Sequence, residues 1–186
     1  MMSGPATTRS SAIIDALSRE KGKAEIVDGR IVRMSPAGWQ HGRASMAIAI
    51  SLRAHERSHG GGHAFADNVG FLVDLPSRQS FSPDAAWYTG SVVDMRFLEG
   101  APAFAVEIRS ENDYGPLAEN EIRTKRAEYF AAGTLVVWDV DLLGEIVIRA
   151  YRASTPDIVT AYRRGDVAEA EPAVPGWRFP VEELFE

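Results

Sequence analysis

Apolar residues recur every three or four positions in two stretches of the chain, which is the spacing of one face of an α-helix. The stretches are residues 10–20 and residues 39–57, and three consecutive glycines follow the second. A third helix is predicted over residues 116–132, because Pro116 suits a first helical turn and Gly133 suits a C-terminal cap. The apolar positions are Ile13, Ile14 and Leu17 in the first stretch, and Met46, Ala47, Ile50 and Ala54 in the second.

Alternating or continuous apolar runs predict strands in most of the remaining chain. Residues 24–35 are predicted to form a hairpin, because Asp28-Gly29, a favoured two-residue turn, separates two alternating runs. Later runs predict four strands and then an antiparallel pair, before a closing segment that is irregular and briefly helical. The four strands are 68–74, 83–89, 104–110 and 134–141; the pair is 145–152 and 157–164; the closing segment is 175–185.

The order of helix, strands, helix and strand is typical of a mixed sheet with helices packed on it. We therefore expect an α/β (α+β) fold with a mixed β-sheet flanked by helices, an N-terminal β-hairpin and C-terminal antiparallel strands. Residues 1–20 are expected to form a tail and a short helix, and residues 21–186 a single domain. A length of 186 residues suits one domain with a substantial core.

Composition narrows the class of protein. The chain has no cysteine, so disulfides and thiolate metal sites are excluded. No apolar run approaches the roughly 18 residues that span a bilayer, and the first residues lack a secretory apolar segment. We therefore expect a cytoplasmic protein without a membrane partner. A net charge of −6 argues against binding nucleic acid through a broad basic surface, although positive charge can be local.

Two acids interrupt the apolar pattern. Asp84 follows Pro83 at the start of a predicted strand, a position where proline is tolerated, so its carboxylate is expected near a strand end. Glu107 lies in the run 104–108, which is otherwise apolar and therefore predicts a strand covered on both faces. A buried acid is costly unless it is paired or binds a metal. The structural alternative is an ion pair between Glu107 and an arginine.

Hard cations such as Mg²⁺ take oxygen ligands, often one or two carboxylates with water and phosphate. Asp84 and Glu107 on neighbouring strands would meet that demand, and the backbone carbonyl of Ile108 could add an oxygen. Arg109 could contact phosphate but cannot act as a base, because it stays protonated. Lys125, on the third predicted helix, could orient or deprotonate the attacking water. Its alternative role is a surface salt bridge with Glu121, four residues earlier.

The order of these residues resembles the PD-(D/E)XK nuclease-like superfamily, and within it a bacterial family of restriction endonuclease-like proteins. The resemblance rests on Pro83-Asp84, the segment 107–110, the helix with Lys125 and Tyr129, and the strand 134–141. It extends to the segment EIVDGRIVRMSPAGWQHG and the ending PGWRFPVEELF, and so covers about residues 24–185.

The resemblance implies a restriction-endonuclease-like core in which Asp84 and Glu107 bind the metal. The superfamily usually has a lysine two residues after the glutamate, where this chain has Arg109; the narrower family takes its lysine from the next helix, at the position of Lys125. An acid from the first core helix is also common in the superfamily. Glu56 and, from the hairpin, Glu25 are the two candidates here. His41 matches a family histidine that could touch phosphate or a metal-bound water, or only make local hydrogen bonds.

These observations lead to a Mg²⁺- or Mn²⁺-dependent endonuclease that hydrolyses DNA, with RNA left open as a substrate. A homodimer is expected, because two symmetric sites cut two strands most simply. The alternatives are an inactive nucleic-acid-binding or accessory protein with the same fold, and a structural domain without a metal. Asp139 and Asp141 are expected to face solvent or cap the next turn. The histidines around the glycine run, His55, His59 and His63, are expected in a loop.

Overall fold

The structure, a computed structural model, describes residues 10–186. The predicted tail therefore lies almost entirely outside the described residues. Three α-helices are present among them, close to their predicted bounds. The helices are α1 (Ser11–Leu17), α2 (Trp39–His59) and α3 (Pro116–Ala131), and a 3₁₀ helix, η1 (Val181–Phe185), follows. No helix in residues 10–186 is long and apolar enough to cross a membrane.

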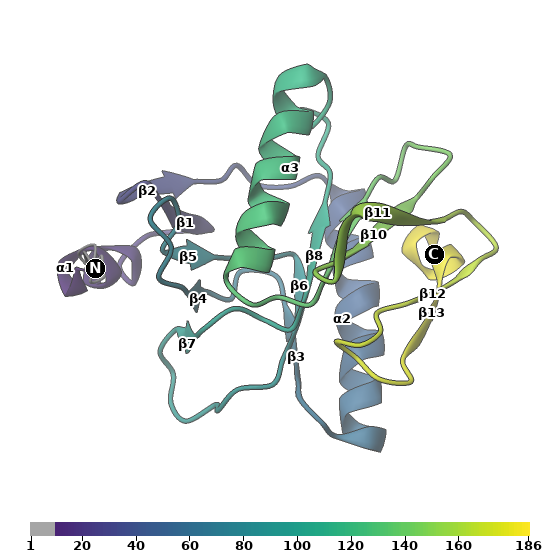
Figure 1. Cartoon of the computed structure of the whole chain (residues 1–186), viewed down its shortest axis with the longest axis horizontal. Coiled ribbons are helices and arrows are strands. Elements are labelled where there is room, and N and C mark those ends of the chain that lie inside the picture. The colour runs from purple at the N-terminus through teal and green to yellow at the C-terminus, as the bar shows by residue number, and fades with distance from the viewer. Residues whose placement is uncertain (1–9) are drawn as a thin grey trace, which may run out of the picture.

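A six-stranded mixed sheet forms the centre of the molecule (Figure 1). Its strand order is β11-β10-β9-β8-β6-β3, in which β8 and β9 are parallel and every other neighbouring pair is antiparallel. This arrangement confirms the predicted mixed sheet and the C-terminal antiparallel pair. The strands are β3 (His63–Ala66), β6 (Ala85–Tyr88), β8 (Phe104–Ile108), β9 (Val136–Val140), β10 (Ile148–Arg152) and β11 (Thr155–Tyr162).

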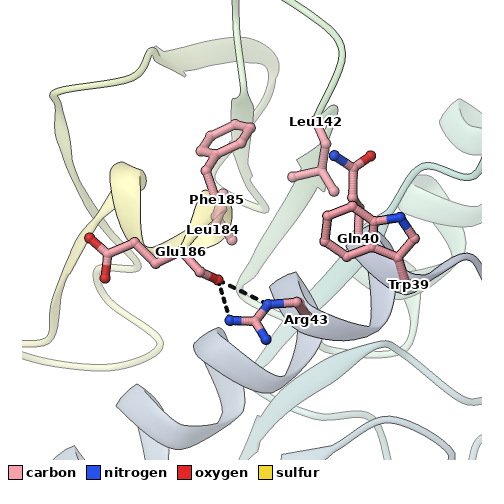
Figure 2. Close-up of a pocket in the computed structure, with 7 residues that line it drawn as sticks. All are labelled: Trp39, Gln40, Arg43, Leu142, Leu184, Phe185 and Glu186. Atoms are coloured by element: carbon pink, nitrogen blue, oxygen red, sulfur yellow. Dashed lines mark hydrogen bonds between the residues drawn. The ribbon is translucent and has the colours of Figure 1, made fainter.

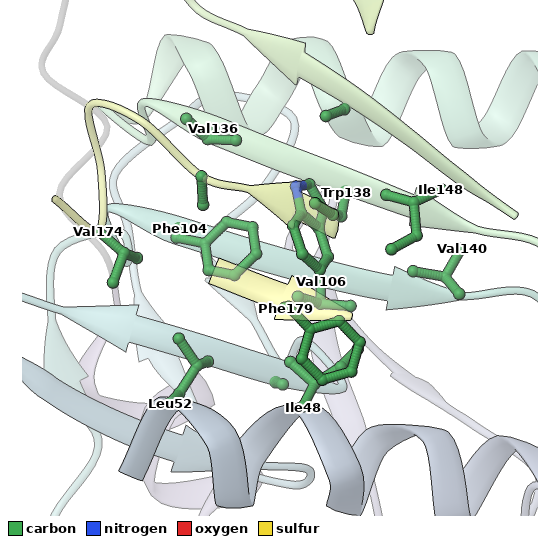
Figure 3. Packing of buried hydrophobic residues seen from close by; sticks show 14 of the residues in the cluster. Ile48, Leu52, Phe104, Val106, Val136, Trp138, Val140, Ile148, Val174 and Phe179 are labelled. Carbon is green, nitrogen blue, oxygen red and sulfur yellow. The ribbon is translucent and has the colours of Figure 1, made fainter. Parts of the chain in front are cut away.

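Both faces of this sheet are covered, as the apolar run around Glu107 predicts. One core joins α2 to β6, β8, β9, β10 and the C-terminal segment, with Trp138 and Phe104 fully buried in it (Figure 3). A second core on the opposite face includes Tyr129 of α3 together with Ala105 and Val137. Because side chains alternate along a strand, Glu107 lies on the same face as Ala105, toward α3.

The N-terminal hairpin forms as predicted from β1 (Ala24–Val27) and β2 (Arg30–Arg33). Asp28 and Gly29 both have positive φ, 48° and 69°, as a two-residue hairpin turn with this sequence requires. The hairpin is attached to the rest of the fold at β1, where Ile26 N–H donates to Ser80 Oγ at 2.7 Å. This connection brings Glu25 toward the central sheet.

Three local predictions were wrong. The segment after the glycine run is a strand, β3, and His55 and His59 belong to α2 rather than to a loop. The stretch 68–74 contributes only β4 (Phe71–Leu72), in a separate three-stranded sheet with β5 (Ser80–Phe81) and β7 (Leu98–Glu99). The closing segment contains β13 (Arg178–Pro180), paired with β12 (Val167–Glu169). Such strands of two to four residues are too short for a clear period.

The C-terminal residues pack against the start of α2. Arg43 donates two hydrogen bonds to the main-chain oxygen of Glu186, at 3.0 and 2.6 Å (Figure 2). Trp39 and Phe185 line a cavity of about 40 Å³ beside this contact. Neither Asp84 nor Glu107 lines that cavity.

Candidate active site

Asp84 lies immediately before β6, near the strand end at which the sequence places it. Its backbone is fixed on two sides: its N–H donates to the Val106 carbonyl at 2.9 Å, and Ser45 Oγ on α2 donates to its carbonyl at 2.5 Å. Its carboxylate Oδ2 accepts the Ile108 N–H at 2.7 Å and lies 3.2 Å from His41 Nε2. His41 therefore contacts the acid rather than only its own helix, and Ile108 contributes its amide; metal binding by the Ile108 carbonyl stays a prediction.

Glu107 is one strand away from Asp84 and meets two side chains from α3. Lys125 Nζ lies 2.9 Å from Glu107 Oε2, and the Tyr129 hydroxyl donates to Oε1 at 2.6 Å. Tyr129 is held in turn by stacking on Phe81, with ring centroids 3.9 Å apart. Lys125 Nζ is also 3.0 Å from Glu25 Oε1. The structure thus brings together the acid and the helix lysine that the sequence predicts, and shows no Glu107–arginine pair among the described residues.

Glu25 is the candidate third acid that joins this cluster. It is almost fully buried and accepts the Ser82 N–H at 2.8 Å and an Arg78 guanidinium N–H at 2.5 Å. Arg78 also donates to Glu128 of α3 at 2.6 Å. Glu56, the other candidate, instead binds the backbone at β3. Arg78 was missed because it lies in a loop, where no periodic signal marks its direction.

Lys23 is the second residue that sequence reasoning missed. Its ammonium lies 2.5 Å from Asp84 Oδ1 and 2.7 Å from Asp67 Oδ1. Lys23 directly precedes the β1–β2 hairpin, and Asp67 directly follows β3, so neither belongs to a pattern that predicts a site. The two acids of the predicted metal site therefore each have a lysine partner, Lys23 for Asp84 and Lys125 for Glu107.

Arg109 and Asp139 form a separate ion pair at the edge of this region. The Arg109 guanidinium donates to both carboxylate oxygens of Asp139 at 2.7 Å and also binds Glu119. The expectation that Asp139 faces solvent was wrong: it is buried. Asp141 caps the next turn as expected, by accepting the Leu143 and Gly144 N–H groups. The guanidinium of Arg109 is thus already occupied by two carboxylates.

The pKa values of Glu107 and Lys125 are both raised, for different physical reasons. Burial raises the pKa of Glu107, and the nearby charges of Asp84 and Glu25 add to this rise against the effect of Lys125. Burial acts to lower the pKa of Lys125, but the charges of Glu107 and Glu25 outweigh it and raise that pKa. The raised pKa of Glu107 therefore reflects first the burial of this carboxylate and then the neighbouring acids.

The donor set fits a hard divalent cation. Among residues 10–186 no group of three or more carboxylates or histidines is arranged to hold a metal. Two carboxylates are nevertheless a common protein contribution to Mg²⁺, with water and phosphate as the other ligands. A cavity of about 50 Å³ opens beside Glu107 on the α3 side. Its lining consists of Glu107, Ile122, Lys125, Arg126, Tyr129, Val137 and Asp139.

The free energy of unfolding at acid pH is expected to depend on whether Asp84 is ionised. Burial opposes ionisation, but the hydrogen bond from His41 and the charge of Lys23 lower the pKa of Asp84 from 3.8 to about 2. Its stabilising effect is therefore complete above 3.8 and is lost as pH falls through about 2. In urea unfolding between pH 5 and 2, the free-energy gap between wild type and Asp84→Asn should shrink toward the acid end. A constant gap would contradict the assignment.

Comparison with known proteins supports the fold. A crystal structure described as a "putative nuclease belonging to DUF820", from Anabaena variabilis, matches with a TM-score of 0.71. The match covers 92% of this chain and 96% of that chain, at 14% sequence identity, and so shows a shared nuclease-like fold. A comparison with curated proteins gives no match.

The family model described as "Uma2: Putative restriction endonuclease" matches residues 12–182. The matched range contains α2, α3, all of α1 except its first residue, and the six-stranded sheet, together with Asp84, Glu107 and Lys125. The resemblance drawn from the sequence is therefore confirmed. The chain belongs to the Uma2 family of restriction endonuclease-like proteins.

Proposed function

We propose that this protein is an endonuclease that hydrolyses phosphodiester bonds in DNA and depends on Mg²⁺ or Mn²⁺. The observation that carries the proposal is the contact between Lys125 and Glu107, next to the strand that Asp84 begins. Asp84 directly precedes β6, which is hydrogen-bonded to the strand of Glu107, and Lys125 Nζ is 2.9 Å from Glu107. An Lys125 side chain directed away from the acids would have favoured the inactive accessory protein. Membership of a restriction endonuclease-like family supports nuclease chemistry.

Asp84 and Glu107 would hold the cation. When bound, such an ion polarises the phosphate and lowers the pKa of a bound water. The chain itself supplies the positioning: the Ile108 amide and His41 orient Asp84, and the Tyr129 hydroxyl orients Glu107. These contacts restrict both carboxylates before a ligand arrives, which lowers the cost of assembling the site.

Lys125 has the role of orienting water and stabilising negative charge on the phosphate. Its pKa is raised by Glu107 and Glu25, so in the metal-free site it carries a proton at Nζ at neutral pH. A protonated amine donates hydrogen bonds and cannot accept the proton of the attacking water. This favours orientation over general-base catalysis, the two roles between which the sequence did not decide.

Arg109 is left out of the proposed chemistry. Asp139 and Glu119 occupy its guanidinium, and its side chain is only 6% exposed. A phosphate would have to displace a bidentate carboxylate pair to reach it. We propose instead that Arg109 holds Asp139 at the edge of the cavity beside Glu107. The homodimer also remains part of the proposal, on the symmetry argument for cutting two strands.

The test is cleavage by the purified full-length protein. Supercoiled plasmid, linear duplex and single-stranded RNA are incubated with Mg²⁺, Mn²⁺ or EDTA, with Asp84→Ala as the control. We expect DNA cleavage that requires a divalent ion and is abolished in Asp84→Ala. Mn²⁺ binding is measured in parallel by calorimetry. No cleavage of any substrate, together with no Mn²⁺ binding that depends on Asp84, would overturn the proposal.

A further inference from the structure

The two carboxylate oxygens of Asp84 have different partners. Oδ2 accepts the Ile108 N–H at 2.7 Å and lies 3.2 Å from His41 Nε2. Oδ1 is the oxygen that faces Lys23, whose ammonium lies 2.5 Å away. Oδ2 is thus already engaged by a backbone amide and a ring nitrogen, and Oδ1 is the oxygen at which an added cation could bind.

An added cation at Oδ1 would meet the ammonium of Lys23 at close range. Two positive charges a few ångströms apart repel strongly where water is scarce, and the Lys23 side chain is only 17% exposed. Lys23 therefore has to leave Oδ1 when a divalent ion enters. It has a second carboxylate available: Asp67 Oδ1 is 2.7 Å from the same ammonium, and the Asp67 side chain is 39% exposed.

We propose that Lys23 is a built-in counter-ion that competes with the divalent cation for Asp84, and that Asp67 retains the ammonium when it is displaced. The inference rests on the proposed metal-dependent function and assigns to Lys23 the control of metal affinity. In the metal-free protein Lys23 neutralises the buried carboxylate of Asp84 at Oδ1. Displacing Lys23 from Asp84 costs free energy, and every measured metal affinity is lowered by that cost.

Calorimetric titration of the full-length protein with Mn²⁺ tests the competition. Lys23→Met is expected to bind Mn²⁺ on the order of tenfold more tightly than wild type, the size of one charge-assisted hydrogen bond lost by the competing state. Lys21→Met is the matched control, because Lys21 is exposed and its removal changes the net charge equally. Its Kd should stay within about twofold of wild type, since exposed charges are screened.

Replacing Asp67 is expected to change the Mn²⁺ affinity in the opposite direction. Asp67→Asn leaves the displaced ammonium without its second partner, so Mn²⁺ binding should weaken about threefold in the wild-type background. In the Lys23→Met background the same substitution should have no effect, because no ammonium needs retaining. An equal loss in both backgrounds would mean that Asp67 acts directly on the ion through its charge, and would overturn its assigned role.

The outcomes separate this inference from the proposed function. Equal Mn²⁺ affinity in wild type and Lys23→Met, with binding still lost in Asp84→Ala, overturns the inference and leaves the metal-dependent function standing. Mn²⁺ binding that is detected in Lys23→Met but not in wild type supports the inference most strongly. Absence of binding in both, with native circular dichroism, overturns the inference and the metal-dependent function together.

If Lys23→Met does not fold, Lys23→Gln tests the same inference. Lys23→Gln keeps a hydrogen-bond donor for Asp84 but removes the charge, and Mn²⁺ affinity should rise in the same direction. Without metal, this variant should unfold at a lower temperature than Lys21→Met, because Asp84 has lost its counter-charge. An unchanged Mn²⁺ affinity in Lys23→Gln would overturn the inference.

Discussion

Replacing Lys125 by methionine is expected to reduce DNA cleavage by at least about 10²-fold while Mn²⁺ binding persists. The Lys125 ammonium is the cation that contacts Glu107, at 2.9 Å, and it also contacts Glu25. Its loss removes the donor that orients water beside the metal-binding acids but leaves both acids in place. Single-turnover cleavage with Mg²⁺ and calorimetry with Mn²⁺ measure the two effects separately.

Two further substitutions on α3 make this result specific. Arg123→Met removes one positive charge from an exposed position of the same helix and should leave cleavage unchanged. Lys125→Arg keeps the charge but can never accept a proton. Substantial activity in Lys125→Arg agrees with an orienting cation, whereas complete loss in that variant favours proton transfer at Nζ. Wild-type cleavage by Lys125→Met would remove Lys125 from the mechanism.

Trp138→Ala is expected to cost about 3–5 kcal/mol in the free energy of unfolding. Trp138 on β9 is fully buried, stacks on Trp177 with ring centroids 5.2 Å apart, and packs edge-to-face against Phe104 at 5.0 Å. Truncation would open a cavity between the central sheet and the C-terminal segment. Urea unfolding followed by circular dichroism measures the loss.

Trp39→Ala provides the comparison, because the same substitution is made at a side chain that is 74% exposed. Its cost should stay within about 0.5 kcal/mol, as for most surface substitutions. Similar losses at the two tryptophans would show that Trp138 is not central to the packing. The pair thus isolates burial from the chemistry of the side chain.

Much of the fold could be predicted, because the presence of helices and strands follows from local patterns. The run around Glu107 is covered by one core on each face, as predicted. The helix 39–57 forms as predicted, but its predicted apolar face was wrong: Ile48 and Leu52 pack against the sheet, whereas Met46 and Ile50 are 50% and 62% exposed. The Asp28-Gly29 turn was predictable from local backbone requirements alone. The short strands β4, β5 and β7 were not, because their pairing depends on distant partners rather than on a local pattern.

The candidate site likewise contains some residues that could be predicted from the sequence and others that could not. Asp84 and Glu107 were noticeable because one acid directly precedes an apolar strand and the other lies within one. Lys23 and Arg78 give no such signal: each is a polar residue in a polar segment. Their partners are 61 residues away, from Lys23 to Asp84, and 53 residues away, from Arg78 to Glu25. Ion pairs at that separation depend on how the hairpin is placed against the sheet, which no short pattern determines.

Helix α3 contributes Lys125, Glu128 and Tyr129 to the cluster, at spacings of three and four residues. These positions share one face, and a one-residue shift turns a helix by about 100°. A residue inserted between Lys125 and Glu128 would therefore turn Lys125 away from the face that carries Glu128 and Tyr129. A single substitution removes one side chain but leaves the others on the same face. An insertion before Gly115 would lengthen only the loop 110–115 and leave the three side chains in phase. Length variation in this protein should accordingly be tolerated ahead of α3 and rejected within its last two turns.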